Sequence, residues 1–398
     1  MDRTKLSVFL LVPLLALAAL VAPLWIQGEL PVFRDAGHYY YPSFHFEHEL
    51  WNHGTVPLWS HLDDLGRPFA ADSSTSIFYP VKLLFWLPLS FPNCVLLYLI
   101  THLILAGLNT YYLARRWRAT ASGAALASLS FCVGGAVLTQ HSNIIYLVSA
   151  AWLPLAVSLS LDLIEKQDSR KSLAYLAVTL ALIILGGDPQ MALHVILLIP
   201  LLYCFVSKTS NRNQQPKKVA KRKVAKRMVI ASIIAFGLAA IQILPTYTWS
   251  KNANRNLRSA SRTTFEWIAD QVTGNEVPNN IFKGRRASEH HGQLYQFSLA
   301  PWQMAELAFP NITGKLYPQR QRWTFLFEDN PRTWYPSIYQ GILPLLLALS
   351  IFGMSILLGP ITTAWLLLLS CLDSDSAICC RTLPRRKQIH AVQKLQKA

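Results

Sequence analysis

Residues 6–26 read LSVFLLVPLLALAALVAPLWI, and residues 93–114 read NCVLLYLITHLILAGLNTYYLA. Neither stretch contains Asp, Glu, Lys or Arg, and each has about the 20 residues that an α-helix needs to cross a bilayer. The first stretch is too long for the apolar part of a signal peptide, which is roughly 7–15 residues, and further apolar stretches follow it. We therefore expect an all-α polytopic integral membrane protein whose first helix is retained.

Basic segments alternate with the apolar stretches, which predicts how the chain threads the membrane. Arg3 and Lys5 precede the first stretch, Arg115 and Arg116 follow the second, and residues 217–227 are strongly basic. Because cytoplasmic loops carry an excess of Lys and Arg, the N-terminus and these segments are expected in the cytoplasm. About eight transmembrane helices are expected, at residues 6–26, 93–114, 120–139, 144–164, 172–185, 191–206, 228–249 and within 337–372.

Two long polar segments interrupt this series and are predicted to lie on the extracytoplasmic side. The end of the first segment is broken by Pro80, Pro88 and Pro92, which favours a re-entrant or interfacial piece over a span. After Leu372 the sequence shows no regular pattern of apolar and polar residues. We therefore expect the chain to be part of a longer protein. The expected divisions are a first helix at 1–26, a first loop at 27–92, a helix bundle at 93–249 with a basic cytoplasmic loop at 207–227, a second loop at 250–336, a hydrophobic segment at 337–372 and a tail at 373–398.

The formal net charge of +16 does not by itself indicate nucleic-acid binding. No aromatic residues interleave with the basic run, so attraction to anionic lipid headgroups is the preferred interpretation. The six cysteines form no repeated CxxC pattern, which argues against a zinc site or a disulfide framework. His102 and His194 lie inside predicted spans, where we expect neutral, hydrogen-bonded imidazoles.

The first loop carries most of the candidate chemistry. Residues 30–80 read LPVFRDAGHYYYPSFHFEHELWNHGTVPLWSHLDDLGRPFAADSSTSIFYP, which is rich in Asp, His, aromatic and turn-forming residues. Asp35 comes just after the first span, and a carboxylate there can take a proton from an attacking hydroxyl as general base. The competing interpretation is that Asp35 is the N-cap of the next helix.

Two groups in this loop have the composition of a metal site. His45, Glu49 and His53 are four residues apart and share one face of a helix. They do not form an H-E-x-x-H motif, so an amphipathic helix at the membrane interface is favoured. The pair at 63–64 (Asp-Asp) could hold a divalent cation that neutralises a phosphate, although such pairs usually face solvent. No metal ligand set and no cofactor is predicted, and a divalent cation stays open as an alternative.

Other residues are candidate contacts for a sugar or a phosphate. Rings such as those of Tyr40 and Trp59 stack on carbohydrate, but they also form the aromatic belt of membrane proteins. Arginines can hold a phosphate through two parallel hydrogen bonds, or contact ordinary headgroups. Asp188 lies at an outer helix junction, as a turn former or as a substrate contact. The candidate binding residues are Arg34, His38, Tyr40, Trp59, Arg67, Asp188 and Gln190.

A series of short motifs resembles one known family. In the first loop these motifs are Asp35, YYP at 40–42, Gly54, PLW at 57–59, GRP at 66–68 and FYP at 78–80. Further along they are GDPQ at 187–190, SLAPW at 298–302, FPN at 309–311 and YQGILP at 339–344. With these motifs in this order, the chain resembles the bacterial YfhO-like membrane proteins over most of residues 30–349.

This resemblance implies an architecture similar to the GT-C class of glycosyltransferases, in the bacterial cytoplasmic membrane. Such enzymes take a sugar from a polyprenyl-phosphate-linked donor on the outer face, and an acidic residue of the first outer loop serves as catalytic base. In this chain the matching residue is Asp35. The implied partners are the lipid-linked sugar, a cell-envelope glycan or polymer as acceptor, and membrane lipids. Family members are usually longer than this chain.

Two other functions remain open. A transporter or flippase of a lipid-linked precursor would show inverted repeats and broken helices near the bilayer midplane. We find no convincing repeat, and the polar residues gather in the outer loops, which favours the enzyme. A non-catalytic relative would tolerate the replacement of Asp35 by Asn without consequence.

Overall fold

The computed structural model describes residues 3–62, 66–166, 170–210 and 219–251, together with 301–307 and a few shorter pieces between 309 and 350. The chain divides into two units, residues 1–340 and 341–398. The elements discussed here all belong to the first unit. The paired acids at 63–64 and most of the segments predicted at 250–336 and 337–372 lie outside the described residues.

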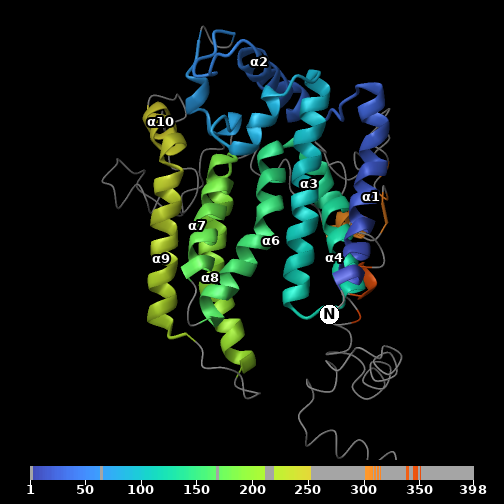
Figure 1. The fold of residues 1–398 in the computed structure, drawn as a ribbon, viewed down its shortest axis with the longest axis vertical. Coiled ribbons are helices and arrows are strands. Elements are labelled where there is room, and N and C mark those ends of the chain that lie inside the picture. Colours follow the sequence, from blue (N-terminus) through green and yellow to red (C-terminus); the bar gives the residue numbers. More distant parts are fainter. Residues whose placement is uncertain are drawn as a thin grey trace, which may run out of the picture. The chain divides into compact units, whose positions relative to one another are not determined.

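The described part of the first unit is helical, and its only extended pairing is an isolated bridge between Ser60 and Arg67. Figure 1 shows the long helices side by side, with the first loop at one end of them. The α-helices are α1 (Arg3–Gln27), α2 (Tyr41–Asn52), α3 (Phe91–Arg116), α4 (Ala121–Val133), α5 (Gly135–Leu138), α6 (Ile144–Glu165), α7 (Arg170–Leu185), α8 (Pro189–Ser210), α9 (Lys221–Leu238) and α10 (Ala240–Lys251). Short helices are the π-helix η1 (Ala36–Tyr40) and the 3₁₀-helices η2 (Phe69–Ala71), η3 (Ser73–Thr75), η4 (Pro80–Trp86), η5 (Thr139–Ser142) and η7 (Pro301–Leu307).

Two described helices, α3 and α6, are long and apolar enough to span a membrane, and the number rises to four if each of two bent helix pairs forms one span. Helix α4 and the helical residues after it bend by 42°, and α9 and α10 bend by 74°. The helix expected at 120–139 and the span expected at 228–249 are therefore each broken into two helices, and each pair can still form one bent span. The first breaks because Gly134 has an extended backbone (ψ 144°) between α4 and α5. The count of eight spans stays a prediction.

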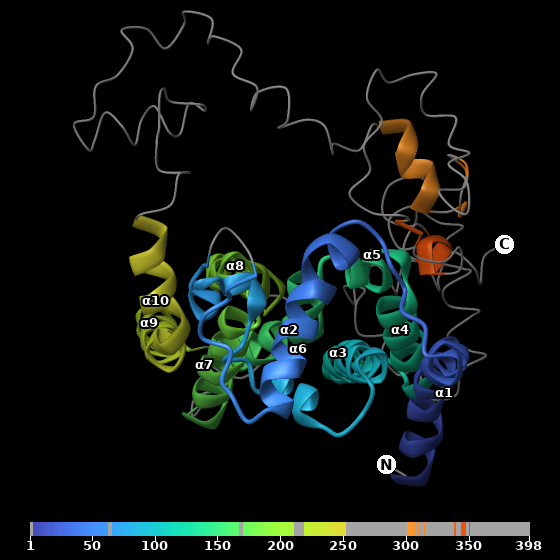
Figure 2. The same ribbon diagram turned by 90° about the horizontal axis from the view of Figure 1, so that it is seen from above.

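The bundle is built around α3, which packs against α1, α4 and α6, while α7 packs against α6, α8 and α9. Figure 2 shows α3 between α4 and α6. Small residues allow α3 and α4 to approach closely: a Cβ on Gly107 would lie 3.1 Å from Ser128 Oγ. The Ser128 hydroxyl donates to the Gly107 carbonyl at 2.7 Å. A polar side chain that bonds across a small-residue contact is typical of membrane helices.

A polar cluster ties the helix ends at the other end of the bundle from the first loop (Figure 1). Arg116 at the end of α3 forms ion pairs with Asp162 and Glu165 at the end of α6. Arg227 of α9 donates to the carbonyls of Leu163 and Lys166, both at 2.9 Å. The residues predicted to face the cytoplasm thus gather at one end. The basic segment expected as a loop at 207–227 is partly helical, since α9 begins at Lys221. Lys and Arg are good helix formers, which agrees with this start.

In the first loop, α2 is held on η4 by a buried ion pair. Lys82 Nζ lies 2.6 Å from Glu47 Oε2, and both side chains are almost completely buried. The same ammonium lies 3.2 Å from the centre of the Phe44 ring. Burial is the largest influence on both groups: it lowers the pKa of Lys82 to about 8 and raises the pKa of Glu47, and each partner partly offsets the effect. Helix α2, which was predicted to be amphipathic, exposes His45 and Glu49 on one face. Its opposite face buries Glu47 against Lys82.

The α7–α8 turn brings the bundle against this loop. Gly187 has φ +100°, and a Cβ at this position would lie 2.9 Å from Ser73 O and 2.5 Å from Ile145 Cγ2. Only glycine satisfies both the conformation and the close approach. The GDPQ motif therefore has a packing role at the contact between η3 and the α7–α8 turn.

Replacing Gly187 by Ala should lower the thermal stability of the detergent-purified protein, because the new methyl group would both strain the backbone and meet the Ser73 carbonyl. The matched control is Gly237→Ala in α9, where a Cβ meets nothing within 4 Å. Glycine inside a helix costs about 0.5–1 kcal/mol relative to alanine, so the control should be as stable as the wild type or slightly more stable. Thermal unfolding of both variants checks the prediction, and equal midpoints for the two would contradict it.

Candidate functional site

A pocket of about 380 Å³ lies in the first loop. Its volume is in the range of small-molecule sites, roughly 300–1,000 Å³. One wall comes from η1 and α2, and the other from the segment around the Ser60–Arg67 bridge. The lining residues are His38, Tyr39, Pro42, Ser43, Phe46, Ser60, Leu62, Arg67 and Phe69. The pocket thus combines one guanidinium, one imidazole and three hydroxyls with aromatic rings.

Arg67 is held in the pocket wall by its backbone and by its side chain. Its N–H donates to the Ser60 carbonyl at 2.8 Å, and its carbonyl accepts from the Ser60 N–H at 2.9 Å. Its Nη1 donates to Asp72 Oδ2 at 2.7 Å, and both side chains of this ion pair are 14% exposed. Its guanidinium carbon lies 5.8 Å from the centre of the Tyr39 ring.

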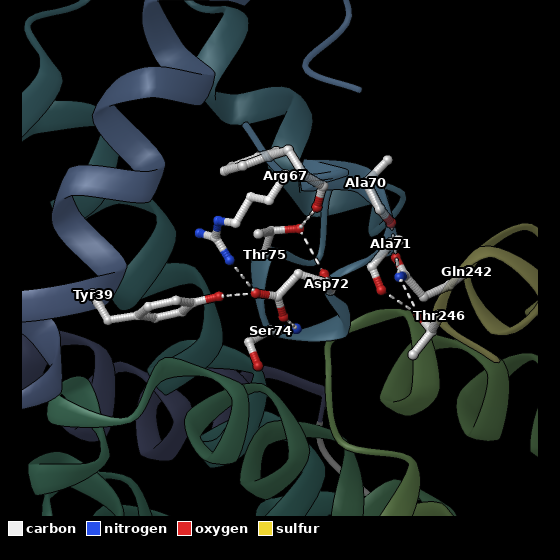
Figure 3. A network of polar contacts seen from close by, with 10 residues as sticks. Tyr39, Arg67, Ala70, Ala71, Asp72, Ser74, Thr75, Gln242 and Thr246 are labelled. Carbon is white, nitrogen blue, oxygen red and sulfur yellow. Dashed lines mark hydrogen bonds and ion pairs between the residues drawn. The ribbon is translucent and has the colours of Figure 1, made fainter. Parts of the chain in front are cut away.

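Asp72 is the centre of the polar network drawn in Figure 3. Its Oδ2 also accepts from the Tyr39 hydroxyl at 2.6 Å, and its Oδ1 accepts from the Ser74 N–H at 3.0 Å as N-cap of η3. Charge-assisted bonds of this kind are about twice as strong as neutral ones. Two pocket residues from distant parts of the loop therefore share a single acceptor oxygen.

These contacts set the charge state of the network. Burial and the nearby Asp72 carboxylate raise the pKa of the Tyr39 phenol, so Tyr39 remains protonated and donates its hydrogen bond. For Arg67, burial opposes the charged form, but contacts with Tyr39 and Asp72 outweigh it and raise the pKa. The pocket wall therefore has a permanent cation, which suits an anionic ligand.

Asp35 lies directly before η1 and is half-buried. Within the described residues its side chain makes no capping hydrogen bond, so it does not act as the side-chain N-cap weighed in the sequence. The carboxylate does not line the pocket; His38 and Tyr39, one helical turn further on, do. Arg34 before it has a left-handed backbone (φ 47°), a conformation that costs a non-glycine residue roughly 1 kcal/mol. Its carbonyl accepts from the N–H groups of Gly37 and His38, both at 3.1 Å.

The structure brings together only two of the predicted binding residues, His38 and Arg67. Tyr40 is the last residue of η1 and is buried, and burial, with nearby Tyr39, Tyr146 and Asp35, raises its pKa. The Trp59 ring covers Gly66, where a Cβ would lie 2.9 Å from Trp59 Nε1.

The other two candidates lie at the start of α8. Asp188 is buried, and its Oδ1 accepts from the Met191 N–H at 3.0 Å. It is therefore the N-cap of α8, which matches the turn-former interpretation. Gln190 is exposed on the first turn of the same helix. Neither residue lines the pocket of the first loop.

The sequence analysis did not propose Asp72, Ser43 or Ser60 as site residues, and it considered Tyr39 only as one of the aromatic residues of the loop that could stack on a sugar. Of these residues, Asp72 could have been found from its local sequence, because an Asp followed by Ser-Ser-Thr is typical of a capping turn. Among the described residues no group of three or more His, Cys, Asp or Glu side chains could hold a metal ion. His45 and Glu49 are both more than half exposed and lie 3.9 Å apart.

His102 shows how the bundle satisfies a polar group next to this loop. Its Nδ1 bonds to the Tyr98 carbonyl at 2.7 Å and its Nε2 to the Tyr79 hydroxyl at 2.9 Å. The Tyr79 hydroxyl accepts in turn from Trp152 Nε1 at 2.8 Å. The carbonyl requires a proton on Nδ1. The hydrogen bonds expected for His102 are therefore present, one within α3 and one to Tyr79 of the first loop, and the neutral state of its ring stays a prediction.

Apolar helices that pack around small residues, together with a polar loop folded over one end of them, define this chain as a helical membrane protein with a site in its first loop. Residues 7–285 match the family described as bacterial membrane protein YfhO, and the chain belongs to this family. The matched region contains the whole first loop and all of α2–α10. Searches of curated proteins and of solved structures found no match. The family resemblance identified from the sequence is confirmed.

Replacing Asp72 by Asn should destabilise the first loop, because the new amide group would direct its own donors at Arg67 and Tyr39. A lost hydrogen bond to a charged group costs about 1.5–3 kcal/mol. Thermal unfolding and limited proteolysis of the purified protein measure this loss. The control is Glu49→Gln, which removes an exposed carboxylate of the same loop and should leave both measurements unchanged. Equal behaviour of the two variants would refute the central role of Asp72.

Proposed function

We propose that the chain is a glycosyltransferase-like membrane enzyme of GT-C type, with about eight spans and a cytoplasmic N-terminus. It transfers a sugar from a polyprenyl-phosphate-linked donor to a cell-envelope acceptor at the outer face of the bacterial cytoplasmic membrane. The observation that carries the proposal is the pocket in the first loop, with Arg67 fixed in its wall. Membership of the YfhO family supports the membrane location.

The chemistry of the pocket supports a ligand with a phosphate and a sugar. A guanidinium attracts phosphate oxygens, and the Arg67 guanidinium lies in the pocket wall. The hydroxyls of Ser43, Ser60 and Tyr39 offer contacts for sugar hydroxyls. The Phe46 and Phe69 rings give an apolar wall against which a sugar face can pack.

Asp35 is the proposed base. It precedes the pocket helix η1 and is one turn from His38, which lines the pocket. A general base works within about 2.6–3.2 Å of the proton it removes, and such contacts often form only when substrate is bound. Binding roles for Arg34, Tyr40, Trp59, Asp188 and Gln190 stay predictions, and so does a divalent cation at the donor phosphate.

The membrane boundary on this side is proposed to lie at η4. In a 3₁₀-helix residues three apart share a face. Lys82 and Phe85 are accordingly buried, whereas Leu83 and Trp86 are 57% and 55% exposed. An exposed leucine and tryptophan just before α3, a candidate span, suit the bilayer interface. The pocket then lies within reach of a lipid headgroup.

A flippase or transporter of a lipid-linked precursor is the second candidate. The observation in its favour is the pair of bent helices, α4–α5 and α9–α10, because broken helices form the substrate sites of many transporters. A non-catalytic assembly protein is a third candidate. Translocation of a labelled lipid without cleavage would identify the transporter.

The test of the enzyme is Asp35→Asn in protein reconstituted in nanodiscs and supplied with polyprenyl-phosphate sugars that carry a radiolabel. Loss of a general base slows catalysis by about 10²–10⁴-fold, so sugar release should fall by at least about 100-fold. The fold should persist, because this side chain makes no capping bond. Glu49→Gln is the control and should retain full release. Equal release by wild type and Asp35→Asn, or none by either, would reject the enzyme.

A further inference from the structure

The segment Ala70–Asp72 has bonding partners on two sides. On one side, Asp72 accepts from Arg67 and Tyr39 of the pocket. On the other side, the two carbonyls just before Asp72 accept from α10: Gln242 Nε2 donates to Ala70 O at 3.0 Å, and Thr246 Oγ1 donates to Ala71 O at 2.7 Å. Figure 3 shows both sets of contacts around the same short stretch of chain.

These contacts join residues that are more than 170 positions apart in the chain. Gln242 and Thr246 are one helical turn apart on the same face of α10, and Gln242 Nε2 also donates to Thr246 Oγ1 at 3.0 Å. Gln242 is 1% exposed. The 74° bend between α9 and α10 gives α10 its own direction, and α10 packs against η2 and η3.

We propose that Gln242 and Thr246 are positioning residues for the pocket of the first loop. They fix the backbone at 70–71, which fixes the direction of the Asp72 carboxylate, and the carboxylate in turn holds Arg67 and Tyr39 at the pocket wall. A displacement of α10 therefore changes the pocket without touching its ligand. Only the chemical class of that ligand, a lipid phosphate, rests on the proposed function.

Thr246→Val is the decisive variant, since it keeps the shape of the side chain and removes the hydroxyl. Thr248→Val is the matched control on the same helix: its hydroxyl donates to the Leu244 carbonyl of its own helix at 2.9 Å and is exposed. Thr246→Ser restores the hydroxyl and should behave as the wild type. Gln242→Met, which removes the donors to Ala70 O and Thr246 Oγ1, is a second variant on the same face.

The first readout does not depend on any ligand. A 3-fluorotyrosine placed at position 39 of the full-length protein reports through its ¹⁹F resonance on the hydrogen bond to Asp72. Thr246→Val and Gln242→Met should shift or broaden this resonance, while Thr248→Val and Thr246→Ser should leave it at the wild-type position. Thermal unfolding of each variant confirms that the protein remains folded.

The second readout is the dissociation constant of farnesyl phosphate for the protein in nanodiscs. Loss of one neutral hydrogen bond weakens an equilibrium by about three- to tenfold, so Thr246→Val should bind this probe more weakly by about that factor, and the control should not. If both α10 variants match Thr248→Val in resonance and affinity, the positioning role is refuted. If the resonance moves and the wild type binds no farnesyl phosphate, the positioning role stands and the proposed substrate class is rejected.

Discussion

The first loop depends on one carboxylate, that of Asp72. Between η1 and η4 the chain has little regular structure apart from α2 and short 3₁₀ turns, so backbone ladders do not determine its path. Asp72 supplies the missing constraint, because its two oxygens accept from Tyr39, from Arg67 and from the backbone of η3. A carboxylate with three donors is well satisfied even when nearly buried. The pocket exists because these donors come from both of its walls.

A second polar contact, between Glu47 and Lys82, fixes the position of η4 against α2. The Glu47–Lys82 pair is almost completely buried, with the ammonium against the Phe44 ring and Trp51 Nε1 donating to Glu47 Oε1 at 3.2 Å. Removing one member of such a pair costs about 3–5 kcal/mol, since the other charge is left without compensation. A pair of apolar residues would stabilise the contact as well, but would accept many arrangements. Each charge therefore needs the other in place, and the pair ties η4 to α2.

The sequence predicted the helices better than the site. Long apolar runs need no partner to be recognised, so α3, expected at 93–114, was found to run from Phe91 to Arg116. The breaks in two other expected spans were not predicted, since an apolar run has the same composition whether its helix is straight or bent. For the pocket, His38 and Arg67 were identified by residue type and by family motif. Asp72, and Lys82 in the contact between η4 and α2, were not identified from the sequence. Their partners Tyr39 and Glu47 lie 33 and 35 residues away, and only the folded chain brings them together.

The two helix breaks bear on the choice between enzyme and transporter. A transporter uses a broken helix to open a polar path near the bilayer midplane. Here each break is followed by an element that contacts the first loop: α10 packs against η2 and η3, and η5 packs against η1. After the α9–α10 bend, the side chains of Gln242 and Thr246 in α10 donate to the carbonyls of Ala70 and Ala71, next to the pocket. The bends therefore support a site at the end of the bundle more than a polar path through it, and this location agrees better with the proposed transfer chemistry at the membrane surface than with transport.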